Sequence, residues 1–259
     1  YQVSYHEDGT FQSIRPIDPA APERVLRYFV TDFEHAYIPT KPPVPYTQVV
    51  FDRIMLEIMR GCTRGCRFCQ AGMLYRPVRE RSVETLVQAA RESIANTGYE
   101  EISLSSLSSS DYSHIEELAN RLTEELKDKR VSLSLPSLRV DKFVQDTLTH
   151  TQKVKKSSLT FAPEAGTQRL RDVINKNVTE EDLKNTLTNA FSNGWNAVKL
   201  YFMTGLPTET DEDLIGIAET ARAAIGAYYS VPKEKRVKGL RVTCSASVFV
   251  PKPFTPFQW

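Results

Sequence analysis

Residues 60–72 read RGCTRGCRFCQAG and contain three of the four cysteines of the chain, spaced as C-x3-C-x2-C. Cys62, Cys66 and Cys69 lie on one short loop, and the glycines between and after them let the backbone fold closely around a metal group. Three such thiolates can hold three irons of a four-iron cubane cluster. One iron then stays open, and an open iron can chelate a substrate or cofactor, whereas a fully ligated cluster only passes electrons.

A structural zinc site is the alternative for these cysteines, with Cys244 or a histidine as the fourth ligand. Structural zinc usually takes two Cys or Cys/His pairs, whereas the four histidines here are far apart in sequence, at positions 6, 35, 114 and 150. The spacing therefore favours an iron–sulfur cluster. An odd, clustered trio does not suit a disulfide framework and indicates a reducing compartment, so we expect a cytoplasmic protein.

Apolar periodicity on either side of the loop predicts alternating strands and helices. Residues 54–58 form a strand that runs into the cysteine loop. Further strands are expected at about 100–107, 130–136, 157–162, 196–203 and 239–250. Helices are expected at about 82–97, 113–128, 140–150, 166–174, 179–193 and 210–228. Six such repeats predict an α/β protein with a parallel sheet and helices packed outside it, while periodicity alone leaves a doubly wound sheet open.

The first 50 residues differ from the rest, because they contain seven of the fifteen prolines. This composition predicts an extended wrapping segment or linker over residues 1–50, ahead of a core domain over 51–259. One helix is expected within the extension. Pro22 suits its first turn, and apolar residues at Val25, Leu26, Phe29, Val30 and Phe33 have helical spacing, so that this helix is expected to dock on the core.

Composition limits the class of protein. The 259 residues carry 33 basic and 32 acidic side chains, a formal charge of +1, and 41% are hydrophobic. This balance excludes disorder for the whole chain and argues against an extended nucleic-acid-binding surface, although not against a local patch. No stretch approaches the roughly 18 apolar residues of a membrane span, so no membrane partner is expected. The chain begins at Tyr1 rather than methionine, and we expect it to be part of a longer protein.

The cysteine loop, with aromatic Phe68 just before the third cysteine, resembles the signature of the radical S-adenosylmethionine (SAM) superfamily. The strings FAPEAGTQRLRDVINK (161–176) and SVFVPKPFTPFQW (247–259) resemble one branch of it, large proteins with an N-terminal cobalamin-binding-type domain and an additional C-terminal domain. The resemblance covers about residues 40–259. It implies a partial TIM-type (β/α)6 barrel, a [4Fe-4S] cluster and SAM.

The resemblance also implies an activity and partners. The expected reaction is reductive cleavage of SAM to a 5′-deoxyadenosyl radical, which abstracts hydrogen from an unidentified substrate at the barrel mouth. It requires an electron donor such as flavodoxin or ferredoxin. Cobalamin would bind through a domain absent from this chain, which contains no D-x-H-x-x-G segment.

Cofactor contacts are expected at the carboxyl ends of the strands, where parallel barrels carry their reactive groups. Ser105 and Ser106 follow the second strand, where the superfamily binds the methionine amino group, although a serine-rich loop can simply be solvated. Glu164 follows the fourth strand, where similar enzymes contact the methionine or ribose part; an exposed turn glutamate near a helix start is the alternative. Lys176 lies where related enzymes often carry an arginine for the cofactor carboxylate.

Three further positions complete the predicted cofactor site. Phe68 belongs to the cysteine loop itself. Met203 ends the fifth strand and resembles the segment that packs the adenine, and Val250 could flank the adenine after the sixth. Apolar residues at strand ends are often only core residues, which is the alternative here. Cys244, within the sixth strand, is expected to be an inert buried residue.

Two rival functions remain. A methylthiotransferase-like enzyme acting on RNA or protein shares the cysteine loop and barrel. It requires a second cluster, for which the one spare cysteine of this chain does not suffice. The other rival is a non-catalytic zinc or electron-transfer module.

Overall fold

The computed structural model describes residues 1–47, 49–134 and 159–258. These residues divide into two compact units, Tyr1–Asp32 and Phe33–Trp259, each of which is described by itself. The helix expected at 140–150 lies outside the described residues. Among those described, no helix is both long and apolar enough to span a bilayer.

The first unit contains an antiparallel hairpin, which periodicity did not predict. Its strands are β1 (Gln2–Tyr5) and β2 (Phe11–Arg15), joined through Gly9 in the left-handed region. The helix expected from Pro22 onward was wrong, because residues 22–32 are irregular. Val25 and Leu26 are 73% and 77% exposed. An isolated helix of this length gains its stability by burying an apolar stripe, and Val25, Leu26 and Phe29 of this stripe are exposed.

The second unit contains two parallel sheets of three strands. Their orders are β3 (Ile54–Glu57), β6 (Glu101–Ser105), β7 (Ser132–Ser134), and β8 (Leu159–Glu164), β9 (Ala197–Thr204), β10 (Arg241–Val248). Every pair in these two sheets is parallel, and neighbours along the chain are neighbours in the sheet. The predicted α/β class with parallel strands is confirmed.

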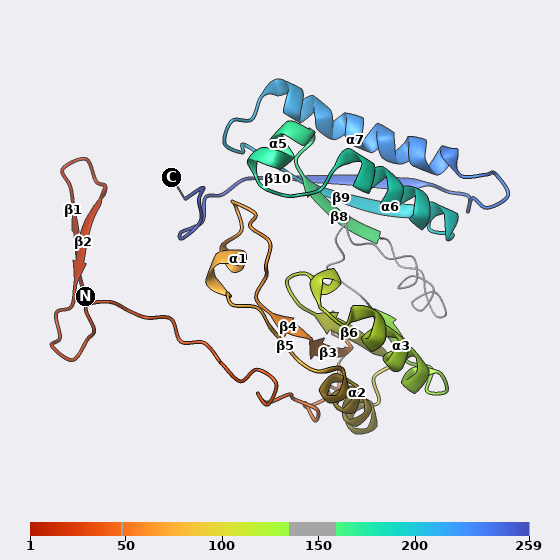
Figure 1. The fold of residues 1–259 in the computed structure, drawn as a ribbon, viewed down its shortest axis with the longest axis horizontal. Helices are drawn as coiled ribbons and strands as arrows, with labels where there is room; N and C mark the ends of the chain where they lie inside the picture. The colour runs from red at the N-terminus through yellow and green to blue at the C-terminus, as the bar shows by residue number, and fades with distance from the viewer. Residues whose placement is uncertain (48, 135–158, 259) are drawn as a thin grey trace. The chain divides into compact units, whose positions relative to one another are not determined.

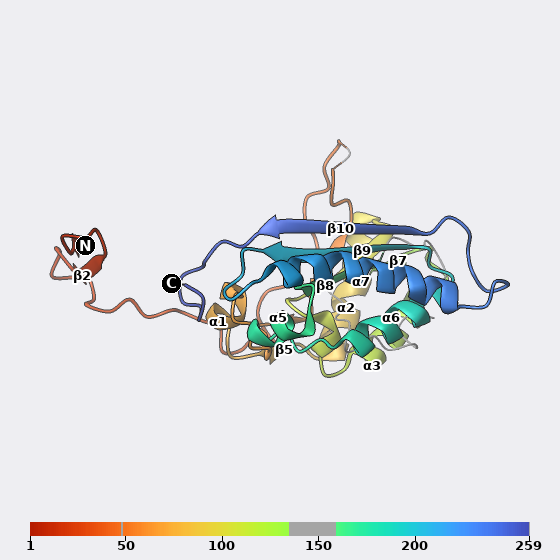
Figure 2. The ribbon, with the colours of Figure 1, turned by 90° about the horizontal axis from the view of Figure 1, so that it is seen from above.

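The long helices cover one face of each sheet (Figures 1 and 2). They are α2 (Val83–Thr97) and α3 (Ile115–Leu126) on the first sheet, and α6 (Glu180–Ser192) and α7 (Asp211–Ser230) on the second. Leu56 and Leu104 pack with the first pair, and Leu200 and Phe202 pack with the second. A doubly wound sheet would carry helices on both faces. The described elements therefore form a partial, unclosed TIM-type barrel.

The remaining elements are short and surround the cysteine loop. They are β4 (Met59–Arg60), α1 (Gln70–Leu74), β5 (Arg79–Glu80), the 3-10 helix η1 (Ser109–Asp111) and α5 (Gln168–Val173). The short strands β4 and β5 pair antiparallel. This pairing closes the base of the loop that carries the cysteines.

Cys244 is exposed, which corrects the expectation that it is buried. It lies in β10, which pairs with β9 alone among the described strands. An edge strand has a neighbour on one side only, so the periodicity of a buried strand overstates its burial. The thiol is therefore useful as an accessible reference in experiments on the other three cysteines.

Gly166 allows the segment after β8 to touch α7. A Cβ atom at Gly166 would lie 2.4 Å from both the Asp213 carbonyl oxygen and the Ile217 nitrogen. The same contact is reinforced by Asp213, whose carboxylate accepts hydrogen bonds from Thr167 and Arg169. Close backbone approach of this kind admits no side chain.

Gly166→Ala is therefore expected to destabilise the protein by about 1–3 kcal/mol, because backbone atoms must move apart. Thermal unfolding of the two proteins measures the loss. Gly226→Ala is the matched control: this glycine lies within α7 with nothing near its Cβ position. Since alanine favours helices over glycine, the control should be neutral or stabilising. Equal melting temperatures for Gly166→Ala and the wild type would contradict the packing argument.

Candidate metal centre

The cysteine loop connects β4 to α1 and places its three thiols differently. Cys62 and Cys66 are 9% and 8% exposed, whereas Cys69 is half-buried at the N-cap of α1. The Cys69 Sγ atom accepts a hydrogen bond from the Gly72 N–H at 3.3 Å. All four cysteines lie among the described residues, and no disulfide joins any of them. The hydrogen bond from Gly72 fixes the orientation of the Cys69 thiol at the start of α1.

The loop passes close to the chain that returns from it. Gly61 has φ +94°, and a Cβ atom there would lie 2.5 Å from the Tyr75 carbonyl oxygen and 2.8 Å from that of Pro77. A left-handed conformation with no space for a side chain requires glycine. Gly61, directly before Cys62, is therefore required by the backbone conformation and by the close packing of the loop.

Asp111, which the sequence analysis missed, anchors the loop to the end of β6. Its carboxylate receives both arms of the Arg64 guanidinium, with Nε–Oδ2 and Nη2–Oδ1 distances of 2.8 and 2.5 Å. Ser108 Oγ also donates to it, at 2.7 Å. Bidentate arginine–carboxylate pairs set orientation as well as energy. The signal available in sequence was an acidic residue that ends the serine run after the second strand.

Asn175 and its neighbour anchor the other side of the loop, and this too was missed. Asn175 Nδ2 donates to the Gly65 carbonyl oxygen at 2.8 Å. The backbone N–H of Arg67 donates to the Ile174 carbonyl oxygen at 2.9 Å. Both contacts join the cysteine loop to the turn after α5. The loop is thus tied to both sheets of the barrel.

Asp111→Asn is expected to lower the stability of the metal-free protein by about 2 kcal/mol, because a charge-assisted hydrogen bond to a mostly buried arginine is weakened. It should also slow incorporation of iron, since Arg64 lies between two cysteines. Glu125→Gln is the control: it removes the acidic partner of the more exposed Arg91 and of Lys129, and should cost under about 1 kcal/mol. Thermal unfolding and iron content measure both effects. Equal losses in the two variants would contradict the anchoring role.

Four of the predicted cofactor residues come together beside the cysteine loop. Lys176 Nζ lies 3.1 Å from Glu164 Oε1 and 5.8 Å from the centre of the Phe68 ring. The Lys176 and Glu164 side chains are only 12% and 17% exposed. Phe68 and Met203 both pack against one apolar cluster that includes Leu206. A charged pair and an apolar wall therefore border the loop.

Glu164 has an unusual backbone for its residue type. Its φ is +70°, in the region that side chains rarely adopt. The β8–β9 register shifts between Phe161 and Glu164, where β8 ends. Non-glycine residues in this conformation cluster at functional sites, where the surrounding structure compensates the strain. The Glu164 side chain is only 17% exposed, so it is not the exposed turn glutamate of the alternative interpretation.

The other three predicted residues have different surroundings. Ser105 ends β6, and its carbonyl oxygen accepts from the Ile58 N–H at 3.1 Å. The hydroxyls of Ser106 and Ser109 are 2.9 Å apart, next to the Asp111 anchor. Val250 is exposed after β10, whereas its neighbour Phe249 packs on the apolar cluster. Contact of these three residues with a cofactor stays a prediction.

The three thiols of the loop suit an iron–sulfur cluster better than a single metal ion. Within residues 1–47, 49–134 and 159–258, no three His, Cys, Asp or Glu side chains converge on one metal ion. A cubane does not require such convergence, because each thiolate binds a different iron. Three soft thiolates on one anchored loop fit the iron–sulfur group.

The profile of the family described as "Radical SAM superfamily" matches residues 56–221. The chain belongs to the radical SAM superfamily. The matched segment begins in β3, includes the whole cysteine loop and extends into α7. The cofactors of this superfamily are a [4Fe-4S] cluster and SAM, and Cys62, Cys66 and Cys69 would hold the cluster.

Two curated relatives and one solved structure show what this radical SAM chain is similar to. An uncharacterized protein of Methanocaldococcus jannaschii is 39% identical over 204 residues, covering 79% of this chain and 42% of the relative. Ribosomal protein uS12 methylthiotransferase RimO of Caldanaerobacter subterraneus is 23% identical over 167 residues, covering 61% and 38%. The radical SAM methyltransferase TsrM of Kitasatospora setae, solved with cobalamin and a [4Fe-4S] cluster bound, has a TM-score of 0.57 at 15% identity, covering 79% and 38%.

These matches define the extent of the shared domain. The radical SAM chain spans less than half the length of each curated relative it matches. At 15% identity the likeness to TsrM concerns the fold. It supports the partial barrel found in the arrangement of the six parallel strands.

Proposed function

We propose that this chain is the catalytic core of a radical SAM enzyme that abstracts a hydrogen atom from a substrate at the barrel mouth. When bound and reduced, the cluster supplies the electron that cleaves SAM to methionine and a 5′-deoxyadenosyl radical. One observation carries the proposal: the Lys176–Glu164 pair lies beside the cysteine loop, with the Lys176 ammonium group 5.8 Å from the ring centre of Phe68 in that loop. Ligands for a cluster and charged groups for an amino acid moiety thus share one site.

The chain's own residues bind and orient the cofactors. Cys62, Cys66 and Cys69 hold the cluster. The Lys176 ammonium group can pair with the methionine carboxylate, and the Glu164 carboxylate can accept hydrogen bonds from an ammonium or a ribose hydroxyl. These contacts would position the sulfonium, since orientation of reacting groups is what a protein contributes to cofactor chemistry.

The remaining predicted residues would complete the cofactor site. Met203 offers an apolar surface for the adenine, and Val250 would flank it after β10. Ser105 and Ser106 would donate or accept at the methionine amino group. Their positions at the ends of β9, β10 and β6 support this assignment.

Polar side chains on the sheet face turned away from the helices indicate that the substrate is polar. In β9, Leu200 and Phe202 pack on the helix side, so Lys199 and Tyr201 point to the opposite face. Tyr201 pairs with Ser245 of β10 on that face. Hydroxyl and ammonium groups there would bind a substrate with several polar groups, and the full protein would require a reductant such as flavodoxin or ferredoxin. Cobalamin, if used, would be held by a domain outside this chain.

Anaerobic reconstitution of the full-length protein tests the proposal. With iron, sulfide and a reductant, it should bind about four irons per chain and convert SAM to 5′-deoxyadenosine. Assays with and without cobalamin, followed by product analysis, would then identify the reaction. Binding of zinc in place of iron, or a bound cluster without SAM cleavage, would refute the proposal and favour a structural or electron-transfer module.

A methylthiotransferase is the second candidate, favoured by the 23% identity to RimO. Such an enzyme requires a second cluster. Beyond the loop, this chain has only Cys244, on an exposed edge strand. The additional ligands would have to come from outside the chain. Iron counting separates the candidates, because the full-length protein would then bind about eight irons rather than four.

A further inference from the structure

Phe33 makes an unusual contact at the base of the cysteine loop. Phe33 is 2% exposed, and its ring contacts two guanidinium groups, with the Cζ atoms of Arg60 and Arg81 at 4.8 and 4.2 Å from the ring centre. A guanidinium group over the face of an aromatic ring is attracted by the negative charge of that face. A core-filling phenylalanine would have aliphatic neighbours instead. The contact therefore holds the two arginine side chains in place as well as burying the ring.

Arg60 connects this ring to the first cysteine. It ends β4 and is followed directly by Gly61 and Cys62. Both arms of its guanidinium contact the Glu57 carboxylate, at 2.8 and 2.6 Å, and this pair raises the pKa of Arg60. The Arg60 side chain is thus held by Glu57 on one side and by the Phe33 ring on another. The Gly61 backbone packs closely against the Tyr75 and Pro77 carbonyl groups, so a displacement of Arg60 would reach Cys62 through a segment that has little space to move aside.

Phe33 belongs to a segment, residues 33–40, that we call the strap. It is fastened to the core by Arg81, whose Nη1 donates to the Glu34 and Ala36 carbonyl oxygens at 3.0 and 2.9 Å. The Glu34 carboxylate accepts from the Ser82 N–H at 2.7 Å and from the Thr85 hydroxyl at 2.6 Å. These are the first residues of α2, where a carboxylate is favoured by the helix dipole.

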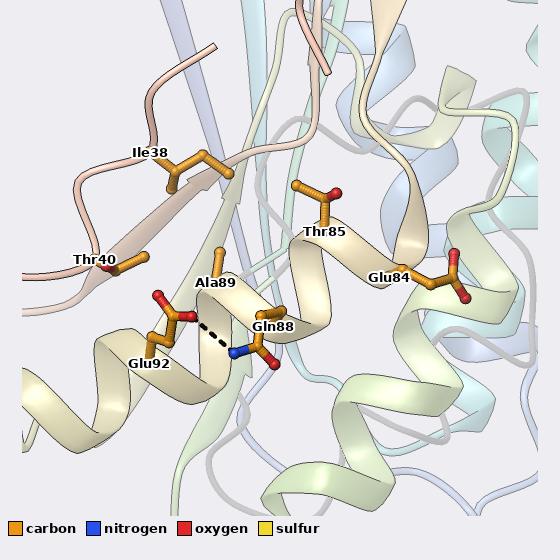
Figure 3. Close-up of a pocket in the computed structure, with 7 residues that line it drawn as sticks. All are labelled: Ile38, Thr40, Glu84, Thr85, Gln88, Ala89 and Glu92. Atoms are coloured by element: carbon orange, nitrogen blue, oxygen red, sulfur yellow. Dashed lines mark hydrogen bonds between the residues drawn. The ribbon is translucent and has the colours of Figure 1, made fainter. Parts of the chain in front are cut away.

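The strap continues along α2 after these contacts. Asn96 Nδ2 donates to the Thr40 carbonyl oxygen at 3.1 Å. Ile38 and Thr40 line a pocket of about 420 Å³ together with Thr85 and Ala89 of α2 (Figure 3). The strap therefore has its own attachment to the core at several points. Phe33 is the point at which that attachment reaches the cysteine loop.

We propose that Phe33 is a positioning residue for the cluster: from the strap it holds Arg60, and through Arg60 it sets the position of the ligand Cys62. The proposal rests on the assignment of Cys62 as a cluster ligand. Under this proposal, a segment about 30 residues before the cysteine motif belongs to the cluster site. Residues that orient metal ligands typically change metal affinity about 10- to 100-fold when replaced.

Alkylation of thiols in the metal-free, full-length protein provides the first test. Phe33→Leu keeps an apolar side chain but removes the ring, and should raise the rate at which iodoacetamide modifies buried Cys62 about tenfold, which corresponds to local opening that is about 1.4 kcal/mol easier. Exposed Cys244 is the internal reference and should react at an unchanged rate. Phe191→Leu, a similarly buried ring under the second sheet, is the control for general loss of stability. It should leave Cys62 protected.

Iron retention in the reconstituted protein provides the second test. Phe33→Leu should lose iron to a chelator about tenfold faster than the wild type. Arg60→Lys, which keeps the charge but not the planar fork, should have a similar effect. The double variant should lose iron no faster than either single one, because both changes break the same link. Additive effects, or a Phe33→Leu protein that matches Phe191→Leu in both tests, would overturn the proposal.

The two tests separate this proposal from the proposed function. If the wild type bound no iron, the function would fail, while the alkylation rates of the metal-free protein would still decide the role of Phe33. Unchanged Cys62 reactivity in Phe33→Leu, with normal iron binding by the wild type, would overturn the positioning role alone.

Discussion

Replacing Cys62, Cys66 and Cys69 together by alanine is expected to abolish iron binding and SAM cleavage completely. Iron–sulfur clusters are held by thiolate ligands, and an alanine methyl group cannot replace one. After anaerobic reconstitution the variant should lack the absorbance of a cluster, contain no iron above background and form no 5′-deoxyadenosine. The effect is larger than for any other change in the chain, because the cofactor itself is lost.

Cys244→Ala is the matched control for this experiment. Cys244 is exposed on β10 and belongs to no part of the proposed site. Its replacement should leave iron content and SAM cleavage at wild-type levels. SAM cleavage that survives the triple substitution would refute the proposed function. Loss of the cluster in Cys244→Ala would show that a fourth thiol takes part.

Lys176→Met is expected to weaken SAM binding about 10- to 100-fold. A hydrogen bond to a charged group contributes about 1.5–3 kcal/mol, and 1.4 kcal/mol corresponds to a factor of ten. Methionine keeps the length and packing of the lysine stem beside Phe68 but removes the charge. The Kd for SAM, measured on the reconstituted protein with the cluster bound, reports the loss. Iron content should stay at the wild-type level.

A double variant distinguishes cofactor binding from a structural role of the pair. Lys176→Met alone leaves the Glu164 carboxylate mostly buried without its cation, which is destabilising. Adding Glu164→Gln removes that charge, so thermal stability should recover. If Lys176 binds the SAM carboxylate, affinity for SAM should stay low in the double variant. Recovery of SAM affinity together with stability would show that the pair is only structural.

The cysteine motif and the alternation of the long helices with the strands of the two parallel sheets could be predicted from the sequence. Both depend on residues that are close in the chain: the spacing of Cys62, Cys66 and Cys69, and apolar periodicities over one element. The helix expected at 82–97 is found at Val83–Thr97, with Ser82 as its N-cap and Gly98 as its C-cap. The repeated pattern of strand and helix then selected the parallel α/β class.

Predictions failed where burial or a distant partner decided the outcome. The apolar stripe at Val25 and Leu26 has helical spacing but is not buried, so the helix is absent. Cys244 has the pattern of a buried strand but lies at a sheet edge. Asp111 and Asn175 act on the cysteine loop from 47 and 110 residues away from their partners. No local pattern contains such information.

By itself, the sequence indicated three candidate cluster ligands, the alternation of strands and helices in the core, and the superfamily, because thiolate chemistry and helical or strand periodicity are properties of short segments. Tertiary structure alone decided which charged and aromatic groups hold that ligand set in place. Arg64, Arg60 and Gly65 meet Asp111, Phe33 and Asn175 only after the chain has folded. Charge pairs, cation–π contacts and hydrogen bonds act over a few ångströms, so their partners are defined by distance in space.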